Sequence, residues 1–137
     1  MTCIFCEIVR GNAPAFKVHE DDHTLTFMDI FPVSRGHALI IPKDHFENLF
    51  EANEESLARI VTRSLALAKA IRRVIAPDGL GVYQLNGAAA GQTVFHYHMH
   101  LIPRFKGGRL DLHSRVRGKD ADLEAVSREI AAALEAG

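Results

Sequence analysis

The sequence predicts an α+β fold, with a five-stranded antiparallel sheet, one long helix between the third and fourth strands, and a C-terminal helix. Three observations lead to this prediction. Five short stretches are alternately or continuously apolar, as β-strands are. One long stretch, 53–76, repeats its apolar residues at helical spacing. A shorter stretch of the same kind lies near the C-terminus.

Length and charge limit the functions that are open to this chain. Its 137 residues suit one domain, spanning 1–137, that can bury a real core. The net charge of −1 gives no positive excess for nonspecific nucleic-acid binding. The N-terminal residues do not resemble a secretory signal, and no apolar run is long enough to span a bilayer. We therefore expect a cytoplasmic protein that binds neither nucleic acid nor membrane.

The first three strands are expected near the N-terminus. Segments 15–19 and 24–29 contain strand-forming residues on either side of a polar turn. The second of these carries on one face Leu25, Phe27 and Asp29. Segment 37–42, HALIIP, is apolar enough to be a central strand covered on both sides. Asp44 with Glu47 three residues later resembles a capping box and predicts the start of a short helix.

The long helix is predicted to start after Asn53, a suitable N-cap, and to stop before Pro77-Asp78-Gly79. Its positions at helical spacing are Leu57, Ile60, Val61, Ser64, Leu65, Ala68, Ile71 and Ile75. Leu67 and Val74 widen this apolar face. A wide face is expected either on a helix that packs against both the sheet and a partner subunit, or on one buried deeply in its own domain.

The fourth strand is predicted over 80–85, LGVYQL. Asp120 is expected to cap the last helix. One side of that helix carries Leu123, Val126, Ile130 and Leu134.

Cys3 and Cys6 form a C-x-x-C pair close to the N-terminus. In a reducing compartment such a pair indicates metal binding or redox activity rather than a structural disulfide. A redox pair is expected at the end of a strand that opens a helix, but only two residues precede Cys3. Half of a zinc site is therefore favoured over a redox pair, and two inactive thiols are the third alternative.

The fifth strand, 95–104, has the sequence FHYHMHLIPR. Strand side chains alternate between faces. One face is therefore expected to carry His96, His98 and His100, and the other Phe95, Tyr97, Met99 and Leu101. Three interpretations are open: a polar surface, a catalytic metal site, or an imidazole that acts as a nucleophile. The preceding Gly-rich loop, 86–93, can offer backbone N–H groups to anionic oxygens.

Several segments together resemble the histidine triad (HIT) family. The signature His-x-His-x-His followed by two apolar residues appears as HYHMHLI over 96–102. Segments 3–22, 27–45 and 86–104 resemble the family's N-terminal hairpin, central segment and active-site segment, in the expected order. The C-x-x-C pair and the absence of tryptophan make the chain more similar to bacterial, zinc-containing members than to the eukaryotic phosphoramidase branch.

The resemblance implies a nucleotide hydrolase that cleaves purine nucleoside phosphoramidates or dinucleoside polyphosphates at the α-phosphate. His98 would be the nucleophile and form a nucleotidyl-histidine intermediate, with its other ring nitrogen donating to a backbone carbonyl. His100 would hold phosphate oxygens with the help of Thr93 and Gln92. His37 would support both the nucleophile and the phosphate. Release of the intermediate by water would give a nucleoside monophosphate.

The same resemblance implies roles for residues around the triad. Asp29 would accept hydrogen bonds from the ribose hydroxyls, and Asn86 would lie near the ribose and phosphate. The apolar pocket for the base would comprise Phe5, Ile8, Phe27, Ile30 and Leu39, although ordinary core packing is the alternative for these five. A closed, structural Zn²⁺ site would comprise Cys3, Cys6, His45 and His96. Residues that match no functional position and are expected at the surface are His19, His23 and His113.

Two further expectations follow. We expect a homodimer with segments 53–76 and 80–85 at its interface, from the resemblance and the wide apolar face. The alternative function is a nucleotide-binding regulatory module with vestigial catalysis. The presence of all three triad histidines favours the enzyme.

Overall fold

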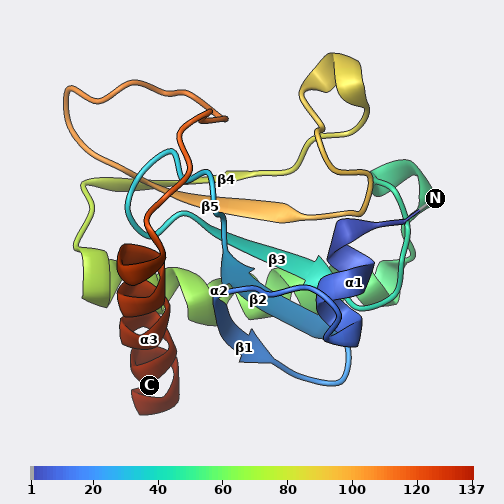
Figure 1. The fold of residues 1–137 in the computed structure, drawn as a ribbon, viewed down its shortest axis with the longest axis horizontal. Coiled ribbons are helices and arrows are strands. Elements are labelled where there is room, and N and C mark those ends of the chain that lie inside the picture. The colour runs from blue at the N-terminus through green and yellow to red at the C-terminus, as the bar shows by residue number, and fades with distance from the viewer. Residues whose placement is uncertain (1) are drawn as a thin grey trace.

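The computed structural model describes residues 2–137, and a single five-stranded sheet lies at its centre (Figure 1). The strands are β1 Lys17–Glu20, β2 Thr24–Met28, β3 Ala38–Pro42, β4 Gly79–Tyr83 and β5 Met99–Arg104. Their order in the sheet is β1-β2-β3-β5-β4, and all neighbouring strands are antiparallel. The predicted sheet is confirmed.

Three α-helices and two 3-10 helices complete the described part of the chain. They are α1 Ile4–Arg10, η1 Leu49–Glu51, α2 Glu54–Ile75, η2 Ala88–Ala90 and α3 Asp120–Ala136. The long helix and the C-terminal helix are confirmed. Among residues 2–137, no helix combines the length and the apolar character that a membrane crossing requires.

The central strand β3 is buried on both faces, as its sequence predicts. Ile40 belongs to the apolar cluster on one face of the sheet. Leu39 and Ile41 belong to the cluster on the other face, together with Phe5 of α1. The two faces therefore have separate cores, and α1 covers the second one.

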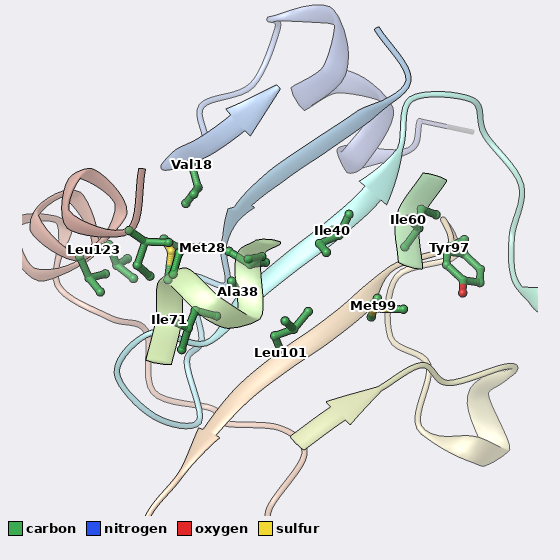
Figure 2. Packing of buried hydrophobic residues seen from close by; sticks show 14 of the residues in the cluster. Val18, Met28, Ala38, Ile40, Ile60, Ile71, Tyr97, Met99, Leu101 and Leu123 are labelled. Atoms are coloured by element: carbon green, nitrogen blue, oxygen red, sulfur yellow. The ribbon is translucent and has the colours of Figure 1, made fainter. Parts of the chain in front are cut away.

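Helices α2 and α3 pack against the first face and against each other. Figure 2 shows Ile60 and Ile71 of α2 lying over Ile40 and Leu101 of the sheet. Leu123 of α3 belongs to the same cluster. These helices occupy one face, so the opposite face is left for α1 and the histidines.

The wide apolar face of α2 is divided in two by the fold. Ile60, Leu67 and Ile71 are fully buried, whereas Val61 and Leu65 are 57% and 61% exposed. Asn53 caps the helix through its side chain, as predicted, and Ala76 ends it in a left-handed conformation. The exposed apolar strip stays available for the predicted dimer contact.

One helix was not predicted, and two local predictions are wrong. Helix α1 lies inside segment 3–22, and its N-cap is Cys3, whose sulfur accepts from the Cys6 N–H. The short helix predicted from Asp44 starts later, where Asn48 caps η1. Asp120 is the first residue of α3 rather than its cap, because its backbone is already helical.

Candidate active site

The triad histidines lie on one side of the chain, as predicted, although only His100 lies within β5. Tyr97, Met99 and Leu101 point into the first core. The three histidines are buried on the opposite side. Phe95 was expected in the core but is 43% exposed, because β5 starts only at Met99 and residues 93–98 are irregular.

The hydrogen bond of His98 determines which of its nitrogens is free. Nδ1 lies 2.7 Å from the backbone oxygen of His96. A carbonyl only accepts, so Nδ1 carries the proton and the neutral ring keeps its lone pair on Nε2. Burial lowers the pKa of His98, which favours this neutral form. The Phe5 ring packs nearly perpendicular to His98 at 5.2 Å and holds its orientation.

His37 and His100 form a directed pair. The Val33 N–H donates to His37 Nδ1 at 3.0 Å, so the proton of neutral His37 lies on Nε2. That nitrogen lies 2.9 Å from His100 Nδ1, which therefore accepts. The proton of His100 is then on Nε2, a buried nitrogen with no hydrogen-bond partner among the described residues. Burial lowers the pKa of both rings to about 3, so both are neutral near pH 7.

Asp29 lies beside this pair. Its Oδ2 is 3.4 Å from His37 Nε2 and 4.0 Å from His100 Nδ1, and its Oδ1 accepts from the Phe31 N–H. Burial raises the pKa of Asp29. These three side chains are close enough together to hold a metal ion. However, the Val33 N–H occupies His37 Nδ1 and leaves the proton on Nε2, so the geometry favours a hydrogen-bond relay over a metal site.

A second cluster joins α1 to the triad strand. Cys3 Sγ lies 3.4 Å from His96 Nδ1, Cys6 Sγ lies 3.3 Å from His45 Nδ1, and the two imidazole nitrogens are 3.1 Å apart. A tetrahedral zinc ion with bonds of about 2.0–2.3 Å separates its ligand atoms by roughly 3.3–3.8 Å. The three separations lie within about 0.2 Å of this range, so the four side chains fit one tetrahedral ion after a small adjustment of the imidazoles.

The hydrogen bonding of His96 also suits a metal ligand. Its Nε2 lies 2.8 Å from the Pro42 carbonyl oxygen, so Nε2 is protonated and Nδ1 faces the cysteines with a free lone pair. Burial lowers the pKa of His96 to about 4 and keeps the ring neutral. Two thiols and two imidazoles complete the coordination of such an ion, so this cluster has the composition of a structural site.

Known proteins resemble this chain in sequence and in fold. The family model described as the HIT domain matches residues 10–107. The chain belongs to the HIT family. Protein hit from Bacillus subtilis is 43% identical over 136 residues, covering 96% of this chain and 94% of the relative. Adenylylsulfatase HINT3 from Arabidopsis thaliana is 42% identical over 102 residues, covering 74% of this chain and 52% of the relative.

A solved HIT structure also superimposes on almost the whole chain. It is the Zn-bound histidine triad family protein from Mycobacterium smegmatis, with a TM-score of 0.88 and 39% identity. The superposition covers 99% of this chain and 95% of the other.

Side-chain amides of the loop that precedes the triad, residues 86–93, stabilise the conformation of this loop. Gln92 is buried, and its side chain accepts from the Gly87 N–H and donates to the backbone oxygens of Glu47 and Val94. Asn86 bonds to Gln84 and to the Leu49 N–H. Thr93 is exposed. The structure thus shows Gln92 and Asn86 shaping the loop, and the phosphate and ribose contacts expected of the three residues stay predictions.

The apolar residues expected around the base are only partly grouped by the fold. Phe5, Ile8, Phe27 and Leu39 form part of the second core cluster, whereas Ile30 is not a member of it and is 37% exposed. Phe5 contacts both Phe27 and His98, at ring distances of 5.4 and 5.2 Å. The core interpretation therefore applies to four of the five, and the contact of Phe5 with His98 also suits an apolar pocket.

The sequence did not predict that His113 would lie near the triad. His113 is exposed, as expected, but its Nε2 donates to the Gly91 carbonyl at 2.8 Å and its ring lies 6.3 Å from that of His100. No periodic pattern surrounds His113 in the sequence, so only the fold could reveal this contact.

Proposed function

We propose that this chain is a nucleotide hydrolase that cleaves purine nucleoside phosphoramidates or dinucleoside polyphosphates at the α-phosphate. HIT proteins bind nucleotides, and some of them hydrolyse nucleotides. One observation carries the proposal: His98 keeps a free lone pair on Nε2, and the neighbouring His100 ring carries on Nε2 an N–H that has no hydrogen-bond partner among residues 2–137. The two rings are 4.9 Å apart, so a phosphoryl group between them would meet a nucleophile and a hydrogen-bond donor together.

The reaction has two steps in this proposal. The lone pair of His98 Nε2 forms a bond to the α-phosphorus, and the bond to the leaving group breaks with its electrons on that group. The Nδ1–H bond to the His96 carbonyl stabilises the positive charge on the phosphorylated ring. The N–H of His100 donates to a non-bridging oxygen. Water then attacks phosphorus and loses a proton, the P–N bond breaks, and a nucleoside monophosphate leaves.

The remaining groups bind the nucleoside in this proposal. Asp29 accepts from the ribose hydroxyls through a carboxylate that is half-buried beside His37. Phe5 and Phe27 supply an apolar wall for a purine. Backbone N–H groups of the loop before the triad complete the phosphate site, with Thr93, Gln92 and Asn86 placing them.

We propose a structural Zn²⁺ at Cys3, Cys6, His45 and His96, supported by the fit of the four side chains. A bound ion would supply folding free energy. It would also hold α1 in place through Cys6, because His96 and His45 would bind the same ion. The reaction above uses none of its coordination positions. A zinc-bound relative of the same fold supports this assignment.

Detection of the covalent intermediate tests the function. We expect diadenosine tetraphosphate or adenosine 5′-phosphoramidate to yield AMP, and an alkaline quench followed by peptide mass spectrometry to find adenylate on His98. The His98→Ala variant should fold normally and lose turnover by at least about 10⁴-fold. Near-normal turnover by this variant would exclude covalent histidine catalysis. AMP binding without turnover of either compound by the wild type would support the alternative, a regulatory module.

A further inference from the structure

Positive charge is concentrated at Arg104, the last residue of β5, and in the segment that joins β5 to α3. Residues 104–119 contain six of the sixteen lysines and arginines of the chain but only one of its seventeen acidic residues, Asp111. The six cations are Arg104, Lys106, Arg109, Arg115, Arg117 and Lys119. The segment therefore has a net charge of +5, whereas the rest of the chain has −6.

This segment, which we call the basic loop, is attached at both sides of the active site. His113 donates to the Gly91 carbonyl, in the loop that precedes the triad. Further along, the Gly118 N–H donates at 2.8 Å to the carbonyl of Ile30, the residue after Asp29. Figure 1 shows the loop in orange as it leaves the end of β5 and turns back before α3. The basic loop thus borders the triad.

Most of these cations have no carboxylate partner. Among the described residues, salt bridges join Arg109 to Asp111 and Arg117 to Asp120. The cations without one are Lys106, Arg115, Lys119 and Arg104. Positive charge without a local counter-ion attracts an anionic ligand.

The charge of the basic loop reaches the catalytic groups. The Arg104 guanidinium lies 5.5 Å from the centre of the Tyr83 ring and donates to the backbone oxygens of Arg109 and Asp111. Its charge, after burial, helps to lower the pKa of His37. His113 is placed close enough to lower the pKa of His100 in the same way. Charged groups of the basic loop therefore influence the pKa values of both His37 and His100.

The chemistry of the leaving group fits this electrostatic arrangement. An amine leaving group must gain a proton as its bond to phosphorus breaks, whereas a phosphate leaves as an anion. His37 and His100 are neutral near pH 7 because burial lowers their pKa values, so they are weak proton donors. Fixed cations stabilise the charge that develops on a departing phosphate.

We propose that the basic loop is the leaving-group subsite and that it favours a polyphosphate leaving group over an amine. This inference rests on the proposed function. The bond from His98 Nε2 to the α-phosphorus forms, the bond from that phosphorus to the bridging oxygen breaks, and the electron pair stays on the leaving polyphosphate. The substrate class is therefore the dinucleoside polyphosphates, with His113 anchoring the cations beside the triad.

The test compares two substrates that transfer the same adenylyl group, diadenosine tetraphosphate and adenosine 5′-phosphoramidate. Kinetics of the purified full-length protein give the ratio of their kcat/KM values. We expect the double variant Arg115→Ala/Lys119→Ala to lower this ratio by about fivefold, since each of the two exposed charges contributes up to roughly fivefold. The control, Arg128→Ala on the exposed side of α3, should leave the ratio unchanged. An unchanged ratio in the double variant would overturn the inference, as would an equal loss for both substrates.

A binding measurement separates this inference from the proposed function. Calorimetry with inorganic tripolyphosphate needs no turnover, so it reports on the subsite even if the wild type hydrolyses neither substrate. We expect the double variant to bind tripolyphosphate at least about fivefold more weakly than the wild type and the Arg128→Ala control. Equal binding by all three proteins would refute the subsite. Loss of turnover together with intact, charge-dependent binding would refute only the hydrolase.

Discussion

His37 Nε2 donates to His100 Nδ1 across 2.9 Å, and this contact determines which nitrogen of His100 carries a proton. The direction starts at the Val33 N–H, which occupies the other nitrogen of His37. The Val33 N–H thus determines, through the rings of His37 and His100, that His100 Nε2 carries the proton that would be donated to the phosphate. The pair is therefore a hydrogen-bond relay, and a backbone N–H determines the direction of its hydrogen bonds.

This relay predicts that replacements of His37 differ according to whether they keep a donor. His37→Ala should lower kcat/KM by about 10²–10³-fold, because His100 loses the group that fixes its tautomer. His37→Gln can place an amide N–H near the same position and should retain at least about tenfold more activity than His37→Ala. Steady-state kinetics with a common substrate measure the difference. Equal losses in the two variants would show that the donor to His100 is unimportant.

Buried neutral histidines predict a stability that falls in acid. The folded pKa of His100 is about 3 and the ordinary value is 6.5, so the unfolded chain binds the proton more readily. Stability is therefore complete above about pH 6.5 and decreases as the pH falls towards 3, by up to about 1.4 kcal/mol per pH unit for this ring. Urea unfolding at pH 7, 6 and 5 should show a smaller decrease for His100→Asn. Parallel curves for the two proteins would contradict the assignment.

Zinc removal is expected to affect stability before catalysis. Chelation should lower Tm by roughly 10 °C, since a bound ion would contribute folding free energy, whereas kcat at saturating substrate and 25 °C should stay within about twofold. Cys6→Ser should reproduce the loss of Tm and of bound zinc, measured on the same sample. An immediate loss of kcat at unchanged Tm would place the metal in the reaction.

The exposed strip on α2 predicts a homodimer. Val61 and Leu65 are exposed apolar residues, and β4 is an edge strand with an exposed Val82. Sedimentation at micromolar concentration should find a dimer for the wild type and a monomer for Leu65→Glu. Ala125→Glu, on the exposed side of α3, is the matched control and should remain dimeric. A monomeric wild type would refute the prediction.

A substitution in the core of the first face should destabilise the protein much more than a substitution at an exposed position. Leu101→Ala should destabilise the fold by about 2–5 kcal/mol, because the side chain is fully buried between the sheet and α2. Val116→Ala, at a position 75% exposed in the basic loop, should change stability by less than about 0.5 kcal/mol. Chemical denaturation of both variants provides the comparison. Similar losses would mean that the packing around Leu101 is looser than described.

The strands and α2 could be predicted from sequence because each has a periodic pattern of its own. Ile40 and Leu39 show this most clearly, since a continuously apolar strand has to be covered on both faces. Helix α1 was missed because it is short and its cap is a cysteine sulfur, which is not among the usual capping groups. Phe95 was placed wrongly because alternation predicts a face only where the chain is extended.

The site could be predicted in part. The spacing of the histidines places His98 and His100 on one face, but the proton positions depend on the Val33 N–H and the His96 carbonyl. Those partners are main-chain groups, which every residue has, so no residue type marks them in the sequence. His113 depends on a contact between two irregular loops, which has no local signal either.

Helix α1 has a consequence for nucleotide affinity. It comprises only seven residues, too few for a stable isolated helix, yet it carries both Cys6 and Phe5. One turn therefore couples a thiol of the proposed zinc site to the aromatic wall beside His98. Removal of the ion would make the position of Phe5 less well defined. We therefore expect a higher KM for a substrate that carries a base, whereas the rate of the reaction at phosphorus would change little.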